Sequence, residues 1–148
     1  GWRLGYAACP DKALAQAVGG IQSHSTSNPT SFSQAGGVTA LRQGDEDARK
    51  MCQVFEKRRN LLFDRIAALK PLKPFRPQGA FYLFVNIRDL GMNSITLSEK
   101  LLNEAHLAVV PGKPFGSDDH IRLSFATSEK NLEEAVRRLE VWLKNLPG

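Results

Sequence analysis

The segment Ala80-Phe81-Tyr82-Leu83-Phe84-Val85-Asn86-Ile87 indicates how the second half of this chain folds. It is rich in aromatic and β-branched residues, which fit the pleated, half-buried surface of a strand. The prolines and glycine that come before it, from Pro74 to Gly79, mark a connector. The sequence therefore predicts a strand over residues 80–87.

Helical patterns lie on both sides of this strand. Before it, three acids at positions 45–47 open an apolar stripe with helical spacing, which predicts one long helix that ends near Pro71. After it, Thr96 and Glu99 form a capping-box pattern for a short helix, and residues 128–146 carry another apolar helix face. Brief strands are predicted at 107–110 and 121–126. This order predicts an α/β (α+β) sandwich in which helices cover one face of a short, mostly antiparallel sheet.

The first 44 residues have a different pattern. Residues 2–9 are apolar and aromatic and predict a buried strand, although no partner strand lies near them in the sequence. Two helices are predicted, one from Asp11 to about Ser23 and one from Pro29 to about Gln43, the second with Asn28 as its N-cap. We place the boundary between two units at Gly44, which gives residues 1–44 and residues 45–148.

Composition limits the functional classes. The chain has 148 residues, of which 42% are hydrophobic and 24% are charged, and no stretch approaches the ~20 apolar residues that cross a bilayer. A cytoplasmic protein without a secretion leader is therefore expected. The net charge of +5 is scattered, and its densest run, Lys57-Arg58-Arg59, favours a solvated helix face over a nucleic-acid surface. Cys9, Cys52 and the three histidines lack metal-ligand spacing, so no metal site is predicted.

Arg122 is the strongest candidate for a ligand-binding residue in the predicted sheet. In Ile121-Arg122-Leu123-Ser124-Phe125 it shares one strand face with Ser124, while the apolar residues take the other. A strand arginine commonly lies on a wet edge, yet a planar guanidinium also fits a carboxylate bidentately. The segment from Val110 to Gly116 is either an ordinary turn or backbone held rigidly beside a ligand. The step from Gly79 to Phe81 is either part of a core strand or an aromatic wall beside a substrate.

Taken together and in order, five segments resemble the class I, fold-type I aminotransferases of the aspartate aminotransferase type, especially the aspartate/prephenate branch. The segments are Gly1-Trp2-Arg3-Leu4-Gly5-Tyr6, Gln22-Ser23-His24-Ser25-Thr26-Ser27-Asn28-Pro29-Thr30-Ser31, Pro77-Gln78-Gly79-Ala80-Phe81-Tyr82, Val109-Val110-Pro111-Gly112 with Phe115-Gly116, and Arg122-Leu123-Ser124-Phe125-Ala126-Thr127-Ser128. The resemblance covers the whole chain and identifies it as the C-terminal portion of such an enzyme.

This resemblance implies that the two parts of the chain belong to different domains of the enzyme. Residues 1–44 would be the tail of the large cofactor-binding domain, and residues 45–148 a long linking helix with the small domain. The cofactor would be pyridoxal 5'-phosphate, with Arg3 paired to its phosphate. Arg122 would clamp the α-carboxylate of the substrate, and Phe81 and Gly79 would line the substrate side.

The resemblance further implies a homodimer that shares its active sites, with Ser27 and Asn28 near the dimer contact and a cofactor. The complete enzyme would transfer an amino group between an amino acid and a 2-oxo acid. In the family the Schiff-base lysine comes before the Gly-x-Arg motif, so it would fall outside these 148 residues. We therefore predict no catalytic residue in this chain, no covalently bound cofactor and no activity of the chain alone. The amino-acid preference and an organellar location stay open.

Three alternatives stay open from the sequence alone. The chain could be a non-catalytic domain or truncation product that self-associates, with Trp2, Leu4 and Tyr6 as an uncovered sheet edge. It could belong to another fold-type I enzyme, such as a lyase or decarboxylase. It could also be a basic nucleic-acid module, whose binding would depend steeply on salt.

Overall fold

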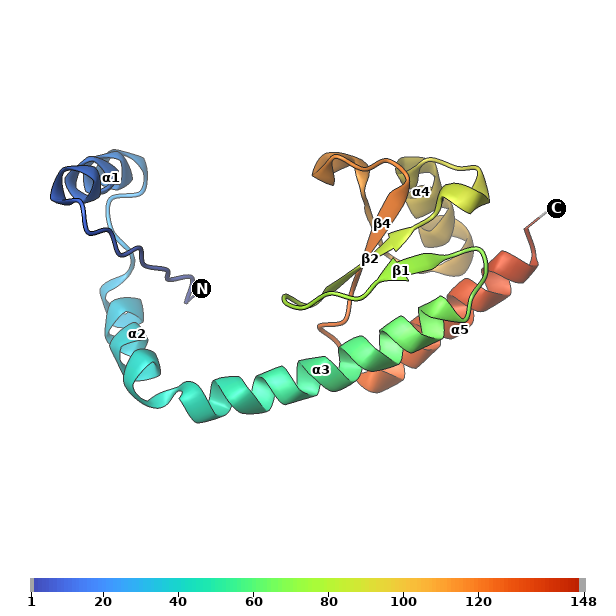
Figure 1. Ribbon diagram of the computed structural model, residues 1–148, viewed down its shortest axis with the longest axis horizontal. Coiled ribbons are helices and arrows are strands. Elements are labelled where there is room, and N and C mark those ends of the chain that lie inside the picture. Colours follow the sequence, from blue (N-terminus) through green and yellow to red (C-terminus); the bar gives the residue numbers. More distant parts are fainter. Residues whose placement is uncertain (1, 147–148) are drawn as a thin grey trace. The chain divides into compact units, whose positions relative to one another are not determined.

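The computed structural model describes residues 2–146 of the chain. They form two compact units, one that ends at Lys50 and one that begins at Met51 (Figure 1). Helix α3 (Asp45–Ala67) begins directly after Gly44, as the three acids predict, and continues through the division between the units. The first compact unit therefore ends at Lys50, inside a continuous helix, and the division of the chain into two domains at Gly44 stays a prediction.

The first unit holds α1 (Lys12–Ser25), α2 (Ser31–Gln43) and the start of α3. Asp11 caps α1, because its carboxylate accepts a hydrogen bond from the amide of Ala13 at 2.8 Å. The predicted cap of the second helix is wrong: α2 begins at Ser31 with Thr30 as N-cap, not Asn28. The side chain of Gln34 instead donates to the carbonyl of Pro29 at 2.8 Å. A residue of α2 thus supplies the hydrogen bond to the turn that precedes the helix.

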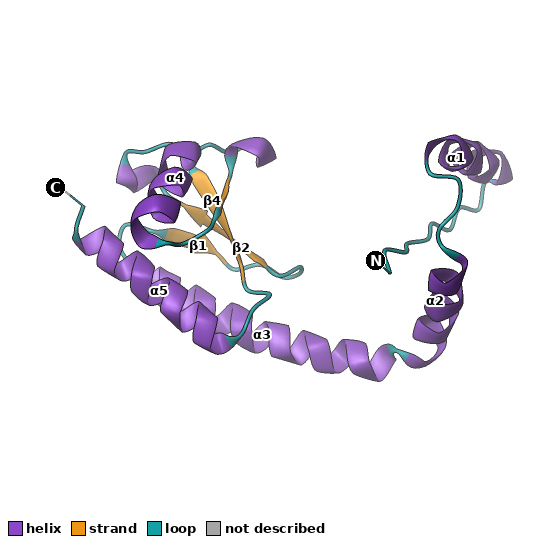
Figure 2. Ribbon diagram, turned by 180° about the vertical axis from the view of Figure 1, so that it is seen from behind, coloured by secondary structure: helices purple, strands orange, loops and turns teal. Residues whose placement is uncertain are grey.

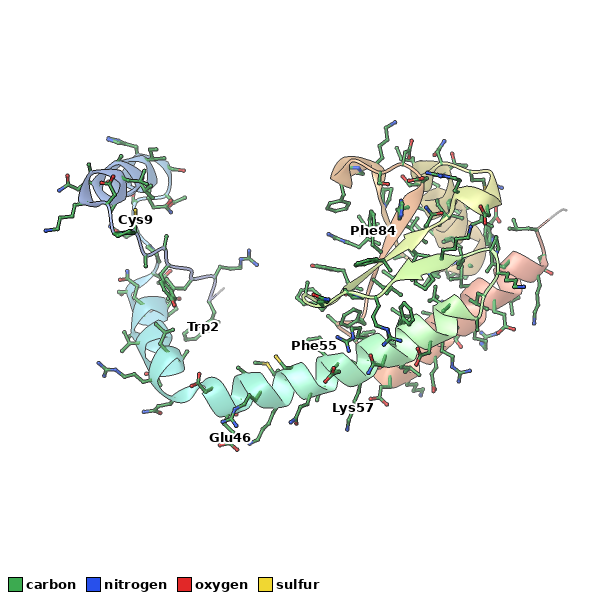
Figure 3. The ribbon with its side chains drawn as sticks, viewed as in Figure 1. Trp2, Cys9, Glu46, Phe55, Lys57 and Phe84 are labelled. Atoms are coloured by element: carbon green, nitrogen blue, oxygen red, sulfur yellow. The ribbon has the colours of Figure 1, made fainter. Side chains whose placement is uncertain are left out.

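Residues 2–9 form no strand and are exposed, so the predicted buried strand is wrong. A strand needs a neighbour to pair with its backbone groups, and the described residues of the first unit supply none. Trp2, labelled in Figure 3, instead meets the ring of Phe32 on α2 edge-on, with 5.6 Å between the ring centroids. The segment is apolar, as the sequence shows, but an apolar pattern does not by itself supply a partner strand.

The second unit is built on an antiparallel sheet of β1 (Lys73–Phe75), β2 (Tyr82–Asn86), β3 (Val110–Pro111) and β4 (His120–Ser124). The order across the sheet is β1-β2-β4-β3. The prediction of a short antiparallel sheet is confirmed. Strand β1 was missed because it contains Pro74, which cannot donate to a ladder but is tolerated on the edge strand it occupies.

Helices α4 (Ser94–Ala105) and α5 (Glu129–Lys144) and the later turns of α3 cover one face of this sheet (Figure 2). Asn93, and not the predicted Thr96–Glu99 box, caps α4, with its side-chain oxygen accepting from the amide of Thr96 at 2.9 Å. Ser128 caps α5. The core between these layers consists of apolar side chains from all of them, including Leu62, Ile66, Leu83, Val85, Leu97, Leu101, Ile121, Leu123, Leu132, Val136, Leu139 and Trp142.

The opposite face of the sheet carries the polar and aromatic residues. Along β2 the buried Leu83 and Val85 alternate with the half-buried Tyr82, Phe84 and Asn86. Because strand side chains alternate between faces, this pattern separates the core from a surface that helices leave uncovered. In Figure 3, Phe84 marks this surface.

Candidate functional site

Arg122 lies on the uncovered face of β4, as its position between Ile121 and Leu123 predicts. Those two neighbours are buried in the core, whereas Arg122 is half-buried. The strand register places Phe84 of β2 opposite Arg122, and Val110 of the edge strand β3 lies opposite it on the other side. The guanidinium therefore stands in the middle of a pleated surface and not at its rim, which differs from the wet-edge interpretation.

Two aromatic rings enclose this guanidinium. Its central carbon lies 4.1 Å from the ring centroid of Tyr82 and 4.5 Å from that of Phe115. Rings at these distances attract the cation through their quadrupoles. Among residues 2–146 no carboxylate lies within ion-pair distance of Arg122, and its Nε is buried without a hydrogen-bond partner. A buried, unmatched donor is costly, so the arrangement favours an anion that would satisfy it.

Phe115 comes from a short connection between β3 and β4. After Pro111 the chain forms one 3-10 turn, η2 (Lys113–Phe115), and then leaves it through Gly116 at a φ of 82°. The amide of Gly112 donates to the carbonyl of His120 at 2.8 Å, and a side chain at Gly112 would collide with the backbone of Ser117 and His120. The segment therefore holds its backbone in place beside Arg122, and its interpretation as the wall of a ligand site stays a prediction.

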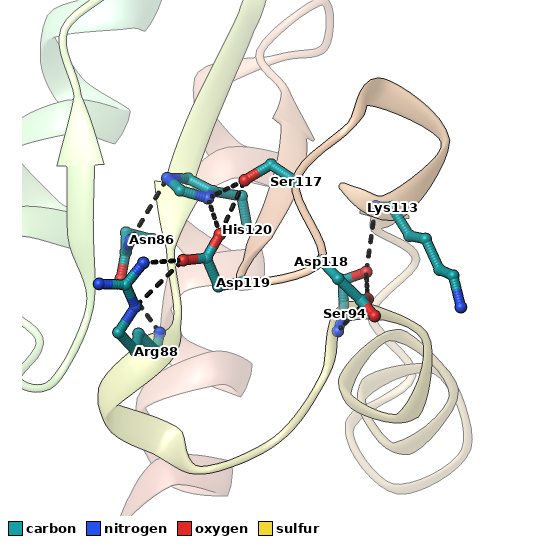
Figure 4. Close-up of polar contacts among 8 residues, drawn as sticks. All are labelled: Asn86, Arg88, Ser94, Lys113, Ser117, Asp118, Asp119 and His120. Carbon is teal, nitrogen blue, oxygen red and sulfur yellow. Dashed lines mark hydrogen bonds and ion pairs between the residues drawn. The ribbon is translucent and has the colours of Figure 1, made fainter.

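The far end of this connection is tied down by a polar cluster on the uncovered face (Figure 4). The carboxylate of Asp119 accepts from Nε of Arg88 at 3.1 Å and from the hydroxyl of Ser117 at 2.7 Å. The ring of His120 lies 2.7 Å from the same carboxylate and stacks on Phe84 with 4.7 Å between the ring centroids. The hydrogen bond from Ser117, followed by those from Arg88 and His120, holds the pKa of Asp119 well below its usual value.

Phe81 and Gly79 lie beside this site but differ in what they contribute. Phe81 is 39% exposed, and its ring centroid lies 4.4 Å from that of Tyr82, the ring beneath Arg122. Phe81 also stacks on Phe55, which points from α3 toward the sheet in Figure 3, with 5.9 Å between the centroids. Gly79 is exposed, lines a small hollow with Phe55, and has open space where a side chain would stand. Phe81 is thus joined to Arg122 through Tyr82.

The other predicted site residues belong to the first unit, where all of them are exposed. Arg3 lies on the irregular 2–9 segment and makes no ion pair with an acid among the described residues. Ser27 has a φ of 61°, and Asn28 lines an apolar hollow between the 2–6 segment and α2. The assignment of these three residues to a cofactor site stays a prediction.

The sequence pointed to Arg122 but not to what surrounds it. Tyr82 and Phe115 were recognised as parts of motifs, and nothing in their spacing shows that both rings reach the same guanidinium. The roles of Asp119 and His120 were missed as well, since the three histidines show no pattern. The pairing of β2 with β4 brings Tyr82 beside Arg122, and the connection after β3 adds Phe115 and Asp119.

Among the described residues, no group of three or more acidic, cysteine or histidine side chains could hold a metal ion. Cys9 and Cys52 are unbonded and exposed. Within the part of the chain that the structure covers, no helix has the length and apolarity to cross a membrane.

Known proteins similar to this chain agree on one family. The model of the family "Aminotransferase class I and II" matches residues 1–139. The chain is 42% identical over 97% of its length to an aspartate aminotransferase of Geobacillus stearothermophilus and spans 38% of that protein. It is 37% identical to a probable aspartate/prephenate aminotransferase of Aquifex aeolicus, of which it also spans 38%.

Solved structures give the same answer. The crystal structure of an aromatic aminotransferase from Pyrococcus horikoshii superimposes with a TM-score of 0.86 at 37% identity, over 97% of this chain and 39% of that one. An aspartate aminotransferase from Thermotoga maritima gives a TM-score of 0.80 at 38% identity, over 90% of this chain and 34% of that one. The chain thus spans little more than a third of the relatives it matches, and it belongs to the class I and II aminotransferase family.

Proposed function

We propose that this chain is part of a pyridoxal-phosphate-dependent aminotransferase of the aspartate aminotransferase type, in which Arg122 binds the α-carboxylate of the amino acid. The observation that carries the proposal is the state of the Arg122 side chain. It is held between Tyr82 and Phe115, has a buried Nε without a partner, and has no acid beside it among the described residues. A planar carboxylate matches the paired donors of such a guanidinium.

The residues that would orient the substrate are supported by their neighbourhood. A carboxylate on Arg122 would lie on the uncovered sheet face, next to the rings of Tyr82 and Phe115. Phe81, which contacts Tyr82, would line the path of the substrate, with Gly79 at the adjacent hollow. Holding the carboxylate at a fixed angle restricts rotation of the rest of the amino acid, which is how binding energy contributes to rate.

Arg3 is the residue that we assign to the phosphate group of the cofactor used by this family. The fit rests on an exposed guanidinium that no acid neutralises among the described residues of its unit. When bound, pyridoxal phosphate supplies an acceptor for the electrons released as the α-proton leaves the substrate. We further propose a homodimer, with Ser27 and Asn28 near its contact and the neighbouring cofactor.

The carboxylate proposal can be tested on the ¹⁵N-labelled chain. Titration with sodium acetate, against sodium chloride at equal ionic strength, is expected to shift the Nε–H resonance of Arg122, identified by its loss in Arg122→Lys. The matched control is the Nε–H of Arg137, which lies on α5 and already donates to Glu134 at 2.7 Å. A response of both arginines alike, or of neither, would contradict specific carboxylate binding at Arg122.

The 148 residues by themselves are expected to be inactive. No lysine precedes Arg3 in this sequence, and the family's cofactor-bearing lysine precedes that arginine. We therefore expect no transamination when the purified chain is mixed with pyridoxal phosphate, aspartate and 2-oxoglutarate. Measurable turnover, lost in Arg122→Lys, would refute this expectation.

A second candidate, self-association without catalysis, is favoured by the first unit. Its described residues expose large apolar side chains, among them Trp2, Tyr6, Ile21, Phe32 and Leu41. An exposed apolar surface of this extent is typical of a region that contacts another protein surface. The surface by itself does not distinguish this candidate from amino-group transfer, because a dimeric enzyme also needs such a surface.

A further inference from the structure

The position of Phe115 depends on the backbone that carries it. Phe115 is 51% exposed, so core packing does not hold it against Arg122. What holds it is the connection between β3 and β4, residues 112–119. Within that connection the amide of Phe115 donates to the carbonyl of Gly112 at 2.8 Å, and the amide of Ser117 donates to the same carbonyl at 3.2 Å. These bonds shape the loop, but they do not attach it to the rest of the unit.

One buried hydroxyl attaches both sides of the loop to α4. Ser94, the first residue of α4, is completely buried. Its hydroxyl donates to the carboxylate of Asp118 at 2.7 Å and accepts from the amide of Lys113 at 3.2 Å. The amide of Ser94 also donates to the carbonyl of Asp118 at 2.8 Å. Lys113 and Asp118 flank Phe115, so a single side chain closes the loop that presents the ring (Figure 4).

We propose that Ser94 and Asp118 form a latch that positions Phe115 against Arg122 and so prepares the guanidinium for a carboxylate. The inference rests on the proposed function only for the identity of the bound group. Ser94 and Asp118 touch neither Arg122 nor a substrate; they are positioning residues that act through Phe115. Opening the latch releases the Lys113–Asp118 part of the loop from α4, while the Asp119 cluster still holds the far end. The ring then leaves one face of the guanidinium, and Arg122 must be ordered by the ligand itself.

A simpler role for Asp118 is to cap α4, and the chain offers a matched control for it. Asn93 caps the same helix through its bond from the amide of Thr96 and has no hydrogen bond to residues 112–119. Asn93→Ala and Asp118→Ala each remove one acceptor from the same helix start, so both are expected to lower the melting temperature. Only Asp118→Ala is expected to change the Nε–H resonance of Arg122 and its response to acetate.

The test uses the full 148-residue chain and two measurements on Arg122. The first is the Nε–H proton shift without ligand, which two stacked rings displace from its ordinary position. Asp118→Ala is expected to remove at least half of that displacement, while Asn93→Ala leaves it unchanged. The second is the acetate midpoint, expected to rise at least threefold in Asp118→Ala and to stay the same in Asn93→Ala. Asp118→Asn keeps an acceptor oxygen and is expected to restore both values.

Ser94→Ala gives a second route in case Asp118→Ala does not fold. It removes the hydroxyl but keeps the backbone bond from the amide of residue 94 to Asp118, and the same two changes at Arg122 are expected. An unchanged Arg122 resonance in a folded latch variant would overturn the inference, as would equal effects of Asp118→Ala and Asn93→Ala. If the latch variants move the resonance but acetate does not affect the wild-type chain, the latch stands and carboxylate binding fails.

Discussion

Arg122 of β4 lies over the ring of Tyr82 of β2, with 4.1 Å between the guanidinium carbon and the ring centroid. The two residues are diagonal neighbours, since Tyr82 pairs directly with Ser124. The antiparallel register therefore sets which ring carries the cation, and the connection after β3 adds Phe115 from the other side. The two strands and this connection thus hold the guanidinium between two rings, without an acid beside it among the described residues.

Replacement of the supporting ring should weaken anion binding without changing the charge. In Tyr82→Leu the loss of one cation–π contact, worth about 1 kcal/mol, is expected to raise the acetate midpoint about fivefold. Tyr82→Phe keeps the ring and is expected to behave as the wild type. The measurement is the acetate titration of the Arg122 Nε–H resonance, and equal midpoints for the two variants would argue against a role for the ring.

The ion cluster on α5 predicts how stability depends on pH. Hydrogen bonds from Arg137 and then Arg138 lower the pKa of Glu134 from 4.5 to about 2. Because the folded-state pKa is depressed, ionised Glu134 stabilises the fold above the unfolded value near 4.5, and this contribution is lost as the pH falls toward 2. Glu134→Gln is therefore expected to be less stable than the wild type at pH 6 and equally stable near pH 2.

Urea unfolding at several pH values would measure this difference in the free energy of unfolding. The control is Glu133→Gln, since Glu133 is exposed and forms no ion pair among the described residues. If the difference in the free energy of unfolding between Glu134→Gln and the wild type grows toward low pH, ionised Glu134 is not the source of the stabilisation.

Two adjacent leucines of α4 test the position of the core. Leu101 is completely buried and Leu102 is 53% exposed. Leu101→Ala is expected to lower the free energy of unfolding by about 2–5 kcal/mol through lost burial and the remaining cavity, and Leu102→Ala by less than about 1 kcal/mol. Denaturant titration of the two variants measures the contrast, and similar losses would mean that the helix is rotated from the described position.

The exposed apolar side chains of the first unit predict association of the full chain. Light scattering coupled to size exclusion is expected to give a mass above the 16.4 kDa of one chain. Ile21→Ser with Leu41→Ser should shift the mass toward that of a single chain, whereas Ile95→Ser, an exposed residue of α4, should not. A single-chain mass for the wild type at all concentrations would remove the self-association candidate.

Much of the fold follows from local sequence patterns. The apolar stripe of α5, with Leu132, Val136 and Leu139, predicts both the helix and the face it buries. The alternation around Arg122 predicts which side of β4 enters the core. These features depend on neighbours within one or two turns or one strand, so the amino-acid order alone decides them.

The sequence by itself determined the helices, two of the strands, the antiparallel class of the sheet and the candidate arginine, together with the family to which its motifs point. The tertiary structure decided what that arginine meets. Tyr82, Phe115 and the latch of Ser94 with Asp118 come from separate elements, and no local pattern encodes their approach. Residues 2–9 show the same limit in reverse, because an apolar pattern becomes a strand only where another strand is present to complete its hydrogen bonds.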